Sequence, residues 1–551
     1  MAYQFDREIM VLTKEEPTSR ERTLYRVTIG MLVLISILLP TLLVFTKQGT
    51  EASHESHVHS FFQISDTHLD LFYDPTIAAK NGEKDGFCRS ISIKGSSANP
   101  KAKSVAKYGR DKCDLPRITI EEAVLKMKNV YNQMDDKAEF VLMTGDQSAH
   151  DYADFNTPDS PTRTIMQSLS NSSMIIGNAF PDIPVYFAFG NNDEPKHNLP
   201  VTENVAAFYS KVRAVWEPFI TRRSNNAEFV KKFRATFDQG GYYSVDINNG
   251  KTVLIILHTM YWSYKAIRQD AKVTKIGDEQ MNWFIQQLKT AKEDGKKVIV
   301  AGHIPPGLVH KQLLFLAFKQ LNSIDARHIN NFAVCSAERC PHPKSKTKEV
   351  MLFRLFSVDK FVGKPAFISN YSSIYLQQTT KDYKDIITAQ LYGHTHSDQW
   401  YIQTVTDTFP KTEGASSFML TMPGLTPVYS ENPSFRLIEY DSKKQRLVDF
   451  KQFYMDLSLS NALQKPIWDV DYSLSEEYNM KDGLTASVVE SVLRKLLDPE
   501  DHGVTVSKYF RHYRSRFDGD MKLRYMEYCG GIYQTEASFK ECMKYYNNGS
   551  L

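Results

Sequence analysis

The sequence predicts a layered α/β fold in which helices flank β-sheets. Apolar runs of strand length recur along the chain, amphipathic helical stretches lie between them, and a short polar turn follows each run. Alternation of this kind is typical of α/β domains, whose strand-end loops meet on one side of the sheet. The chain has 551 residues, of which 42% are hydrophobic, so it is long enough to bury a sizeable core.

The α/β domain is expected over residues 61–455. It begins with the apolar run 61–65, and residues 120–134 follow as a helix with Val124 and Met127 on its buried face. The other predicted elements are strands in the segments AEFVLMTGD, IPVYFAFG, KTVLIILHT and KKVIVAGH and an amphipathic helix over residues 279–292.

The pattern changes at about residue 456. Downstream stretches such as 488–497 have helical periodicity, and Cys529 and Cys542 stand close together near the end of the chain. We therefore expect a helical C-terminal region over residues 456–551, packed on the α/β domain and stapled by one disulfide.

The N-terminal part predicts a membrane anchor. Residues 27–46 are apolar and uncharged, which matches the roughly 20 residues that cross a bilayer as a helix. Arg20, Arg22 and Arg26 crowd its N-terminal side, so residues 1–26 are expected in the cytoplasm, as in a single-pass type II protein. A cleaved signal peptide is the alternative, but this apolar run is long for one. A solvated polar stalk is expected over residues 47–60, including His54, His57 and His59.

The cysteines and sequons agree with a location in the lumen of a vacuole or lysosome or outside the cell. All the cysteines follow the apolar segment, an even number grouped in local pairs: Cys88, Cys113, Cys335, Cys340, Cys529 and Cys542. Glycosylation sequons begin at Asn171, Asn370 and Asn548. A short disulfide is favoured for Cys335 and Cys340, because the alternative, a zinc site, lacks a second ligand pair nearby.

Composition excludes several classes of protein. The formal net charge of +3 excludes a strongly basic nucleic-acid binder and a disordered polyelectrolyte, so no nucleic-acid partner is expected. The 26 glycines and 23 prolines are ordinary for this length and exclude a collagen-like chain. The sequence leaves the oligomeric state open.

Residue types that bind metals recur just after the predicted strands. They lie in five short turns, namely Asp66-Thr67-His68, Gly145-Asp146-Gln147, Gly190-Asn191-Asn192-Asp193, Gly302-His303 and Gly393-His394-Thr395-His396. One such turn is usually a helix cap or a satisfied polar residue. Five such turns in one chain, each directly after an apolar run, indicate a functional site.

The candidate ligands in these turns are four histidines, two aspartates and one asparagine, namely His68, His303, His394, His396, Asp66, Asp146 and Asn191. A mixed nitrogen and oxygen set suits zinc or a similar divalent ion, with manganese, cobalt and magnesium as alternatives. The set is too large for one ion. Two ions about 3.5–4 Å apart, bridged by one carboxylate, would use it and would clamp the attacking and leaving oxygens of a displacement at phosphorus.

At these residues the sequence resembles the calcineurin-like metallophosphoesterases. The segments ISDTHLDLFYDP, GDQSAHDY, AGHIPPG, LYGHTHSD and TPVYSENPSFRLIEYD are similar to the acid sphingomyelinase-like phosphodiesterases and their relatives, the vacuolar endopolyphosphatases. The resemblance covers about residues 61–455 and, more weakly, the helical C-terminal region. It implies a four-layer β-sandwich of the metallophosphoesterase type. No saposin-like module precedes Asp66, which argues against efficient attack on membrane-embedded sphingomyelin.

The resemblance also implies roles for individual residues. Asp66, His68 and His396 would bind one ion, Asn191, His303 and His394 the other, and Asp146 would bridge them. His150 matches a family histidine near the scissile group.

Position 192 departs from the family pattern. Sphingomyelinase-type members have a histidine there that is taken to protonate the leaving oxygen, whereas this chain has Asn192, and an amide has no proton to give near neutral pH. A phosphate leaving from an anhydride needs such an acid less than an alcohol does, so Asn192 favours phosphoanhydrides. The segment GNNDEPKHN also resembles the endopolyphosphatase version of this motif. His197 or His150 acting as the acid would restore phosphodiester substrates.

The favoured function is therefore hydrolysis of inorganic polyphosphate. Lys196, Arg110 and Lys112 are candidates to contact this polyanion, although each has an ordinary surface charge as its alternative explanation. The alternative enzyme is an acid sphingomyelinase-like phosphodiesterase acting on nucleotides, phosphocholine esters or sphingomyelin. A catalytically inactive binding protein is disfavoured, because every candidate ligand is present.

Overall fold

The computed structural model of the chain describes residues 57–78, 88–90, 100–150, 152, 160–224, 226–309, 364–480, 483–517 and 523–548. The predicted membrane anchor 27–46 and the pair Cys335 and Cys340 lie outside these ranges and stay predictions. Within the described ranges, no helix combines the length and the apolar character needed to cross a bilayer.

The first sheet has the strand order β14-β13-β12-β1-β2-β3. Its strands are β1 (Val58–Ile64), β2 (Val141–Met143), β3 (Val185–Phe187), β12 (Ser434–Asp441), β13 (Arg446–Met455) and β14 (Trp468–Ser473). β1, β2 and β3 run parallel, with Phe62 opposite Val141 and Val141 opposite Val185. The other pairs are antiparallel. The carboxyl ends of β1, β2 and β3 therefore lie along one edge of the sheet.

The second sheet has the strand order β10-β11-β9-β6-β5-β4. Its strands are β4 (Tyr243–Ile247), β5 (Thr252–Ile256), β6 (Lys297–Ala301), β9 (Ile387–Tyr392), β10 (Trp400–Gln403) and β11 (Ser417–Thr421). The inner strands β5, β6, β9 and β11 run parallel, and β4 and β10 close the edges antiparallel. A separate antiparallel pair consists of β7 (Leu308–Val309) and β8 (Lys364–Pro365).

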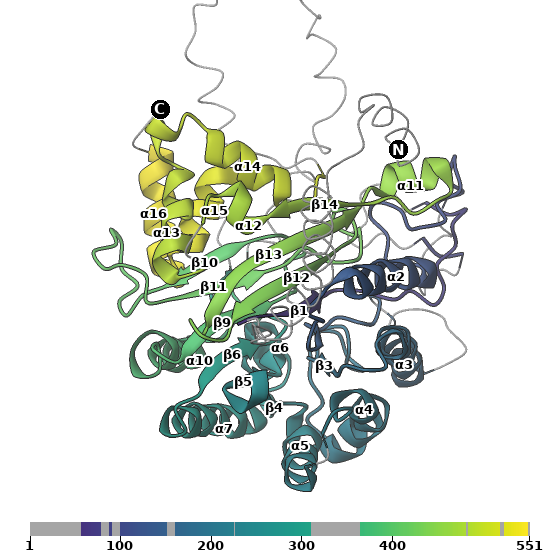
Figure 1. The fold of residues 1–551 in the computed structure, drawn as a ribbon, viewed down its shortest axis with the longest axis horizontal. Coiled ribbons are helices and arrows are strands. Elements are labelled where there is room, and N and C mark those ends of the chain that lie inside the picture. Colours follow the sequence, from purple (N-terminus) through teal and green to yellow (C-terminus); the bar gives the residue numbers. More distant parts are fainter. Residues whose placement is uncertain are drawn as a thin grey trace, which may run out of the picture. The chain divides into compact units, whose positions relative to one another are not determined.

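The two sheets contact each other through a shared core (Figure 1). Two polar contacts cross between them: the Thr252 and Tyr440 hydroxyls lie 3.1 Å apart, and Arg436 donates from Nη1 to the Thr421 carbonyl at 3.0 Å. The apolar strand runs that the sequence predicts supply this core, because their side chains are buried on both faces.

Helices flank the sheets in Figure 1. They are α2 (Arg117–Gln133), α3 (Pro161–Ala179), α4 (Val205–Ile220), α5 (Ala227–Gly240), α6 (Tyr264–Gln269), α7 (Val273–Glu293) and α10 (Ser369–Gln377). α7 packs on β5 and β6 through a stripe that includes Phe284 and Leu288. Shorter helical turns are η2 (Asn248–Gly250), η3 (Thr259–Trp262), η6 (Gln378–Asp382) and η7 (Pro499–Asp501). The predicted α/β fold, with mixed sheets and flanking helices, is confirmed.

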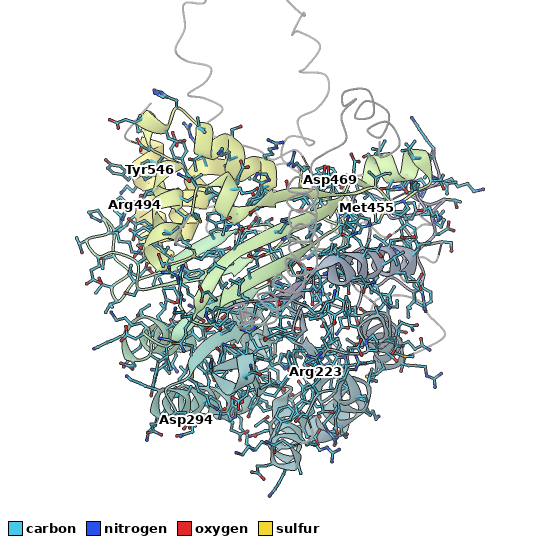
Figure 2. The ribbon with its side chains drawn as sticks, viewed as in Figure 1. Arg223, Asp294, Met455, Asp469, Arg494 and Tyr546 are labelled. Atoms are coloured by element: carbon cyan, nitrogen blue, oxygen red, sulfur yellow. A yellow bond between two sulfur atoms is a disulfide. The ribbon has the colours of Figure 1, made fainter. Side chains whose placement is uncertain are left out.

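The C-terminal region contains the predicted helices and one strand that was not predicted. The helices are α11 (Leu457–Leu463), α12 (Leu474–Glu477), α13 (Ala486–Lys495), α14 (Val504–His512), α15 (Arg524–Ile532) and α16 (Glu536–Asn548). β14 pairs with β13, and Figure 2 shows Asp469 of β14 close to Met455 of β13. The elements described within residues 456–551 are therefore helices apart from β14 and the short turn η7, and β14 departs from the helical prediction. In WDVDYS the larger apolar side chains alternate with polar ones, which is a strand period.

The first strand begins earlier than predicted. β1 starts at Val58 rather than at the predicted Phe61, because Ser60 and its neighbours pair with β12. His59 Nδ1 lies 2.9 Å from Glu139 Oε1, so His59 belongs to the folded domain and not to a solvated stalk.

Two disulfides join described residues. Cys529 and Cys542 link α15 to α16, as predicted, and Cys88 is bonded to Cys113. Disulfides persist in oxidising compartments, which agrees with a luminal or extracellular catalytic domain.

Candidate metal centre

Five strand-end loops bring the candidate ligands together. They are the loops after β1 (Asp66, His68), β2 (Asp146), β3 (Asn191), β6 (His303) and β9 (His394, His396). The first sheet supplies three of these loops and the second sheet supplies two. The site therefore lies where the carboxyl ends of strands from both sheets meet.

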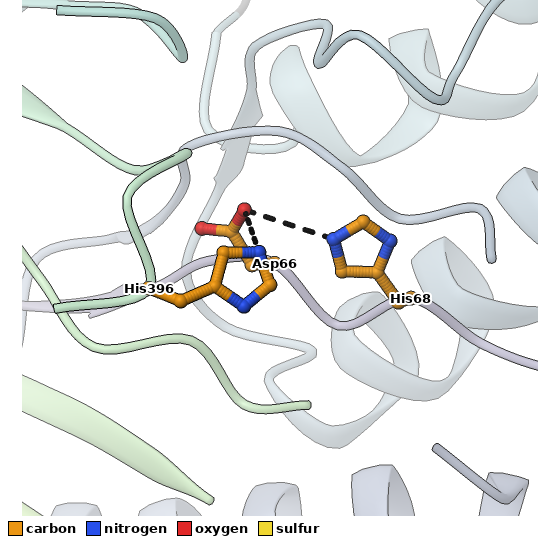
Figure 3. A group of neighbouring side chains, drawn as sticks. All are labelled: Asp66, His68 and His396. Atoms are coloured by element: carbon orange, nitrogen blue, oxygen red, sulfur yellow. Dashed lines mark ion pairs between the residues drawn. The ribbon is translucent and has the colours of Figure 1, made fainter. Parts of the chain in front are cut away.

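Asp66, His68 and His396 form the first group, with ligand atoms within 4.8 Å of one another. Asp66 Oδ1 is 3.1 Å from His396 Nε2 and 3.8 Å from His68 Nε2, and Figure 3 shows both pairs as dashed lines that meet at one carboxylate oxygen. All three side chains are buried. The geometry is that of one protein face of a metal site, with two nitrogens and one oxygen converging.

Asp146, His303 and His394 form the second group. Asp146 Oδ2 is 3.2 Å from His303 Nε2 and also 3.4 Å from His68 Nε2 of the first group. Asp146 therefore reaches both groups, which is the position of a bridging carboxylate. Asn191 Oδ1 lies 3.2 Å from His303 Nε2 and adds an oxygen on that side.

Three of the histidines are held by a hydrogen bond at Nδ1. The acceptors are the Ser148 carbonyl for His68 (3.0 Å), the Thr144 carbonyl for His303 (2.7 Å) and the Glu431 carboxylate for His396 (2.6 Å). With the hydrogen assigned to Nδ1 by these acceptors, a neutral ring presents a lone pair at Nε2. Each Nε2 faces a carboxylate oxygen, at a separation as short as 3.1 Å. Two such electron-rich atoms repel each other in a dry interior unless a proton or a metal cation lies between them. Burial lowers the pKa of His303, but Asp146 outweighs burial and raises that pKa to about 9, and a bound cation would take the place of this proton.

The buried polar atoms of the first group support the same conclusion. Asp66 Oδ1, His68 Nε2 and His396 Nε2 have no hydrogen-bond partner within the described part of the chain. Buried atoms of this kind are rare and costly, and a divalent cation satisfies all three at once. The residues present therefore fit a metal centre with two ions.

The charges of the site favour cation binding. Burial raises the pKa of Asp66, but His396 and His303 outweigh burial and hold that pKa well below its usual range. Burial likewise raises the pKa of Asp146, and His303 and His68 lower it further than burial raises it. Burial lowers the pKa of His68 to about 4, and His150 adds to this effect. The carboxylates are therefore ionised and His68 is neutral at neutral pH, which are the forms that bind a cation.

The ligand loops have an unusual backbone. Five candidate ligands have positive φ angles: Asp66 (50°), His68 (39°), Asp146 (55°), His394 (70°) and His396 (54°). Non-glycine residues adopt this region at a cost in free energy, and such residues cluster at functional sites.

Two glycines let the loops approach closely. A Cβ at Gly190 would lie 2.1 Å from the Asp146 backbone nitrogen, and a Cβ at Gly393 would lie 2.0 Å from Ser65 Oγ. The glycines of these motifs are therefore required by packing rather than by turn geometry alone.

Asp193 supports the Asp146 loop and was not predicted to have a role. Its carboxylate accepts hydrogen bonds from the backbone N–H groups of Asp146, Gln147, Ser148 and Gly190, at 2.8 to 2.9 Å. Burial, followed by the charge of Asp146, raises the pKa of Asp193 to about 7. The sequence signal was present, since Asp193 closes the Gly-Asn-Asn-Asp turn.

Asn192 lies against the candidate bridging carboxylate. It donates from its backbone nitrogen to Asp146 Oδ1 and from Nδ2 to Asp146 Oδ2, both at 2.8 Å. Its amide is thus engaged with a candidate ligand, and it holds Asp146 from the side that faces β3.

His150 is held beside the metal centre by a buried carboxylate. Its ring stacks on His68 with centroids 4.1 Å apart. Asp114 Oδ1 lies 2.9 Å from His150 Nδ1, and Asp114 Oδ2 accepts the His150 backbone N–H at 2.7 Å. On the other side of the ring, the Tyr429 hydroxyl lies 3.2 Å from His150 Nε2. His150 thus has a fixed ring orientation, with Nε2 turned toward Tyr429.

Sequence reasoning missed the charged network behind His150. Arg89 donates to Asp70 Oδ2 at 2.6 Å and lies 3.9 Å from Asp114 Oδ2, and these three side chains are fully buried. The Cys88–Cys113 disulfide joins the residues that immediately precede Arg89 and Asp114. A charged residue directly after each half-cystine was the signal in the sequence.

The predicted substrate contacts lie in different surroundings. His197 is exposed, and its Nε2 lies 3.1 Å from Asn191 Nδ2. Lys196 is exposed on the same loop, and Lys112 contacts Ser430 Oγ next to Tyr429. The Arg110 guanidinium donates to the backbone carbonyls of Ser104 and Pro75, so it serves the fold of its own loop.

Two of the predicted glycosylation sites fall in helices with described side chains. Asn370 is exposed in the first turn of α10, whereas Asn171 is half-buried in α3 and donates to the Gln167 carbonyl at 2.8 Å. Glycosylation remains a prediction at both, and at Asn548 at the end of α16.

The sequence matches two protein families. Residues 59–330 match the family described as calcineurin-like phosphoesterase, and residues 415–549 match the family described as acid sphingomyelin phosphodiesterase C-terminal region. The fold and the converging ligands are therefore those of a calcineurin-like metallophosphoesterase, a class of metal-dependent phosphoester hydrolases with a dinuclear metal centre.

Relatives with similar sequences are phosphodiesterases by name. "Sphingomyelinase phosphodiesterase C" of Dictyostelium discoideum is 26% identical over 79% of this chain and 81% of the relative. "Acid sphingomyelinase-like phosphodiesterase 3b" of Homo sapiens is 25% identical over 82% of each chain. "Cyclic GMP-AMP phosphodiesterase SMPDL3A" of Homo sapiens is 24% identical over 88% of this chain and 90% of the relative. The chain combines a calcineurin-like phosphoesterase domain with an acid sphingomyelinase C-terminal region and is similar to the acid sphingomyelinase-like phosphodiesterases, and it is a metal-dependent phosphoester hydrolase.

Proposed function

We propose that the chain is a two-metal phosphodiesterase of the lumen or the extracellular space, with nucleotide phosphodiesters as its first candidate substrates. The single observation that carries the proposal is the placement of His150, which stacks on a candidate ligand and is held by Asp114 from behind. The phosphodiesterase names of the relatives support the same reaction class. A type II anchor over residues 27–46 is part of the proposal.

Asp66, His68 and His396 would hold one ion, Asn191, His303 and His394 the other, and Asp146 both. Zinc is the proposed metal, because the set mixes imidazole nitrogens with carboxylate and amide oxygens. When bound, the two ions polarise the phosphoryl oxygens and supply an activated water for attack at phosphorus.

His150 would carry the proton to the leaving oxygen. Asp114 accepts from His150 Nδ1 and stabilises the ring when it bears a second proton, so Nε2 is the atom that can hand a proton over. Tyr429 contacts this same Nε2 and keeps it directed away from the Asp114 side. The ring therefore has one nitrogen for support and one for proton transfer.

This role for His150 changes the meaning of Asn192. The chemical argument for polyphosphate as substrate was that the site lacks a general acid. If His150 is that acid, this argument no longer favours polyphosphate over phosphodiesters. Polyphosphate remains a second candidate because the segment GNNDEPKHN resembles the endopolyphosphatase motif and because Asn192 itself has no proton for an alcohol leaving group. Hydrolysis of an anhydride needs such a proton less.

A substrate panel with purified full-length protein tests the proposal. It contains a cyclic dinucleotide, bis(p-nitrophenyl) phosphate, ATP, long-chain polyphosphate and sphingomyelin in micelles, each with metal-depleted protein and with zinc added back. Asp146→Asn serves as the control for contaminating activity. We expect zinc-dependent cleavage of the nucleotide diester with the highest kcat/KM. Polyphosphate cleaved faster than every diester would overturn the proposal in favour of the second candidate.

Leaving-group dependence tests the acid. His150→Gln is expected to slow alkyl diesters by about 10²–10⁴-fold, the usual contribution of a general acid, and to slow p-nitrophenyl diesters much less. Asn192→His is expected to change both rates little, since His150 already acts. A large gain of alkyl diesterase activity in Asn192→His, with no loss in His150→Gln, would show that the wild-type site lacks an acid.

A further inference from the structure

One loop connects the metal centre to the C-terminal region. We call residues 429–434 the Tyr429 loop. Tyr429 contacts His150 Nε2 with its hydroxyl, and its ring meets the His396 ring edge-on with centroids 4.8 Å apart. Glu431 is buried and accepts from His396 Nδ1 at 2.6 Å. The position of this loop therefore decides how both histidines are oriented.

The Tyr429 loop is held by the turn that follows α14. Arg514 donates from Nη1 to the Tyr429 carbonyl at 2.5 Å. Asn432 donates its backbone N–H to the Arg514 carbonyl at 3.3 Å and its side-chain amide to the Ser515 carbonyl at 2.9 Å. The hydroxyls of Ser434 and Ser515 lie 2.9 Å apart. Ser515 stands 83 positions beyond Asn432, so these contacts join distant parts of the chain.

The same turn has a strained backbone. Ser515 and Arg516 are consecutive non-glycine residues with φ of 49° and 64°. Such residues persist only where the surroundings fix them, and they concentrate at functional positions. Arg516 is fixed by Asp471, to which its Nε donates at 2.5 Å. The Tyr513 carbonyl accepts the N–H of Asp398, two residues after His396. The turn after α14 therefore contacts two of the loops that surround the metal centre, namely the Tyr429 loop and the loop that contains His396 and Asp398.

We propose that Arg514 is a positioning residue for the phosphodiesterase reaction. Its guanidinium fixes the backbone of Tyr429, and Tyr429 in turn fixes His150. Arg514 is half-buried and donates to a main-chain carbonyl, so its contact with this loop sets a geometry. Burial raises the pKa of Glu527, and the charge of Arg514 acts to lower the pKa of this residue, which lies away from the Tyr429 loop in the sequence. The C-terminal region is by this inference a part of the active site's framework. The inference rests on the proposed role of His150.

The test measures kcat and KM for a diester that the wild type cleaves. Arg514→Ala is expected to lower kcat by about 10- to 100-fold, the range that follows from misplacing a reacting group by about 1 Å. KM, zinc content and unfolding temperature are expected to stay near the wild-type values. Arg511→Ala is the matched control, because Arg511 is exposed on the adjoining helix α14, and it is expected to change nothing.

A double-mutant cycle separates positioning from general damage. In a Tyr429→Phe background the loss caused by Arg514→Ala is expected to shrink to about twofold, because residues that act through one another are not additive. An equal loss in both backgrounds would overturn the inference, as would a fall in unfolding temperature with proportional loss on every substrate. If Arg514→Ala does not fold, Arg514→Met takes its place, because it keeps most of the length of the side chain without a donor, and wild-type kcat in that variant overturns the inference. His150→Gln is measured in parallel: a variant without effect refutes the proposed acid, whereas a normal loss there with an additive cycle refutes only the role of Arg514.

Discussion

Replacing Asp114 with asparagine tests the support of His150 directly. The change keeps the shape of the side chain and removes its charge. Asp114 is fully buried and bonds His150 twice, through Nδ1 at 2.9 Å and through the backbone N–H at 2.7 Å. A hydrogen bond to a charged group is worth about 1.5–3 kcal/mol. At about 1.4 kcal/mol for each tenfold in rate, kcat for alkyl diesters is expected to fall by about 10- to 150-fold.

The pH dependence of stability gives a second readout. Burial raises the pKa of Asp114, but His150 outweighs burial and holds that pKa well below its usual range. A carboxyl with a depressed folded-state pKa stabilises the fold above its unfolded pKa of about 3.9, and this contribution is lost as pH falls through the folded value. The unfolding temperatures of wild type and Asp114→Asn are therefore expected to differ by a constant amount from neutral pH to about pH 4 and to converge below it.

The assay combines steady-state kinetics on aryl and alkyl diesters, zinc content and thermal unfolding. The alkyl rate is expected to fall more than the aryl rate, with zinc retained, because Asp114 acts through the proton donor. Rates within threefold of wild type on both substrates would refute the reasoning, since a buried charge bonded twice to His150 would then have no influence on the reaction.

Other perturbations probe the site and the topology. Asp146→Asn is expected to abolish activity and to lower the content of both bound zinc ions, and metal analysis measures the number of ions bound per chain. Gly190→Ala is expected to unfold or demetallate the protein, because its Cβ would lie 2.1 Å from the Asp146 nitrogen; thermal unfolding and zinc content measure this. Burial raises the pKa of Glu194 to about 8, so the free energy of unfolding falls as pH rises from the unfolded-state pKa toward 8. Glu194→Gln is therefore expected to unfold at a higher temperature than wild type at pH 9 but not at pH 5, as thermal unfolding at the two pH values would show. In sealed microsomes, added protease is expected to remove only residues before the anchor 27–46, and digestion of the catalytic domain would reverse the topology.

The candidate ligands could be predicted from sequence because they share one local pattern. Each candidate ligand follows a buried strand, and parallel strands bring their carboxyl ends to one edge of a sheet. Ligands from distant parts of the sequence could therefore be expected to lie close together. The separate roles of Asp66, His68 and Asp146 came from the family resemblance and remain proposals.

The supporting residues did not share this pattern. Asp114 and Tyr429 come from loops without a strand-end motif, and they meet at His150 only after the chain has folded. Asn192 shows a related limit. That its amide has no proton to give follows from the residue type, but its direction toward Asp146 depends on the close approach of two loops at Gly190. β14 was missed for a third reason: a short strand among helices carries too few residues for its period to stand out.

The split origin of the site couples metal binding to the cohesion of the domain. In the proposed assignment, loops of the first sheet hold Asp66, Asp146 and Asn191, and loops of the second hold His303 and His394. Bound ions would then act as noncovalent cross-links between the sheets. Each would raise the free energy of unfolding by about 2.7 kcal/mol when free metal stands at 100 times its dissociation constant. The heat resistance of the enzyme is thereby tied to the metal supply of the compartment in which it works, and a chelator would weaken the whole domain as well as its chemistry.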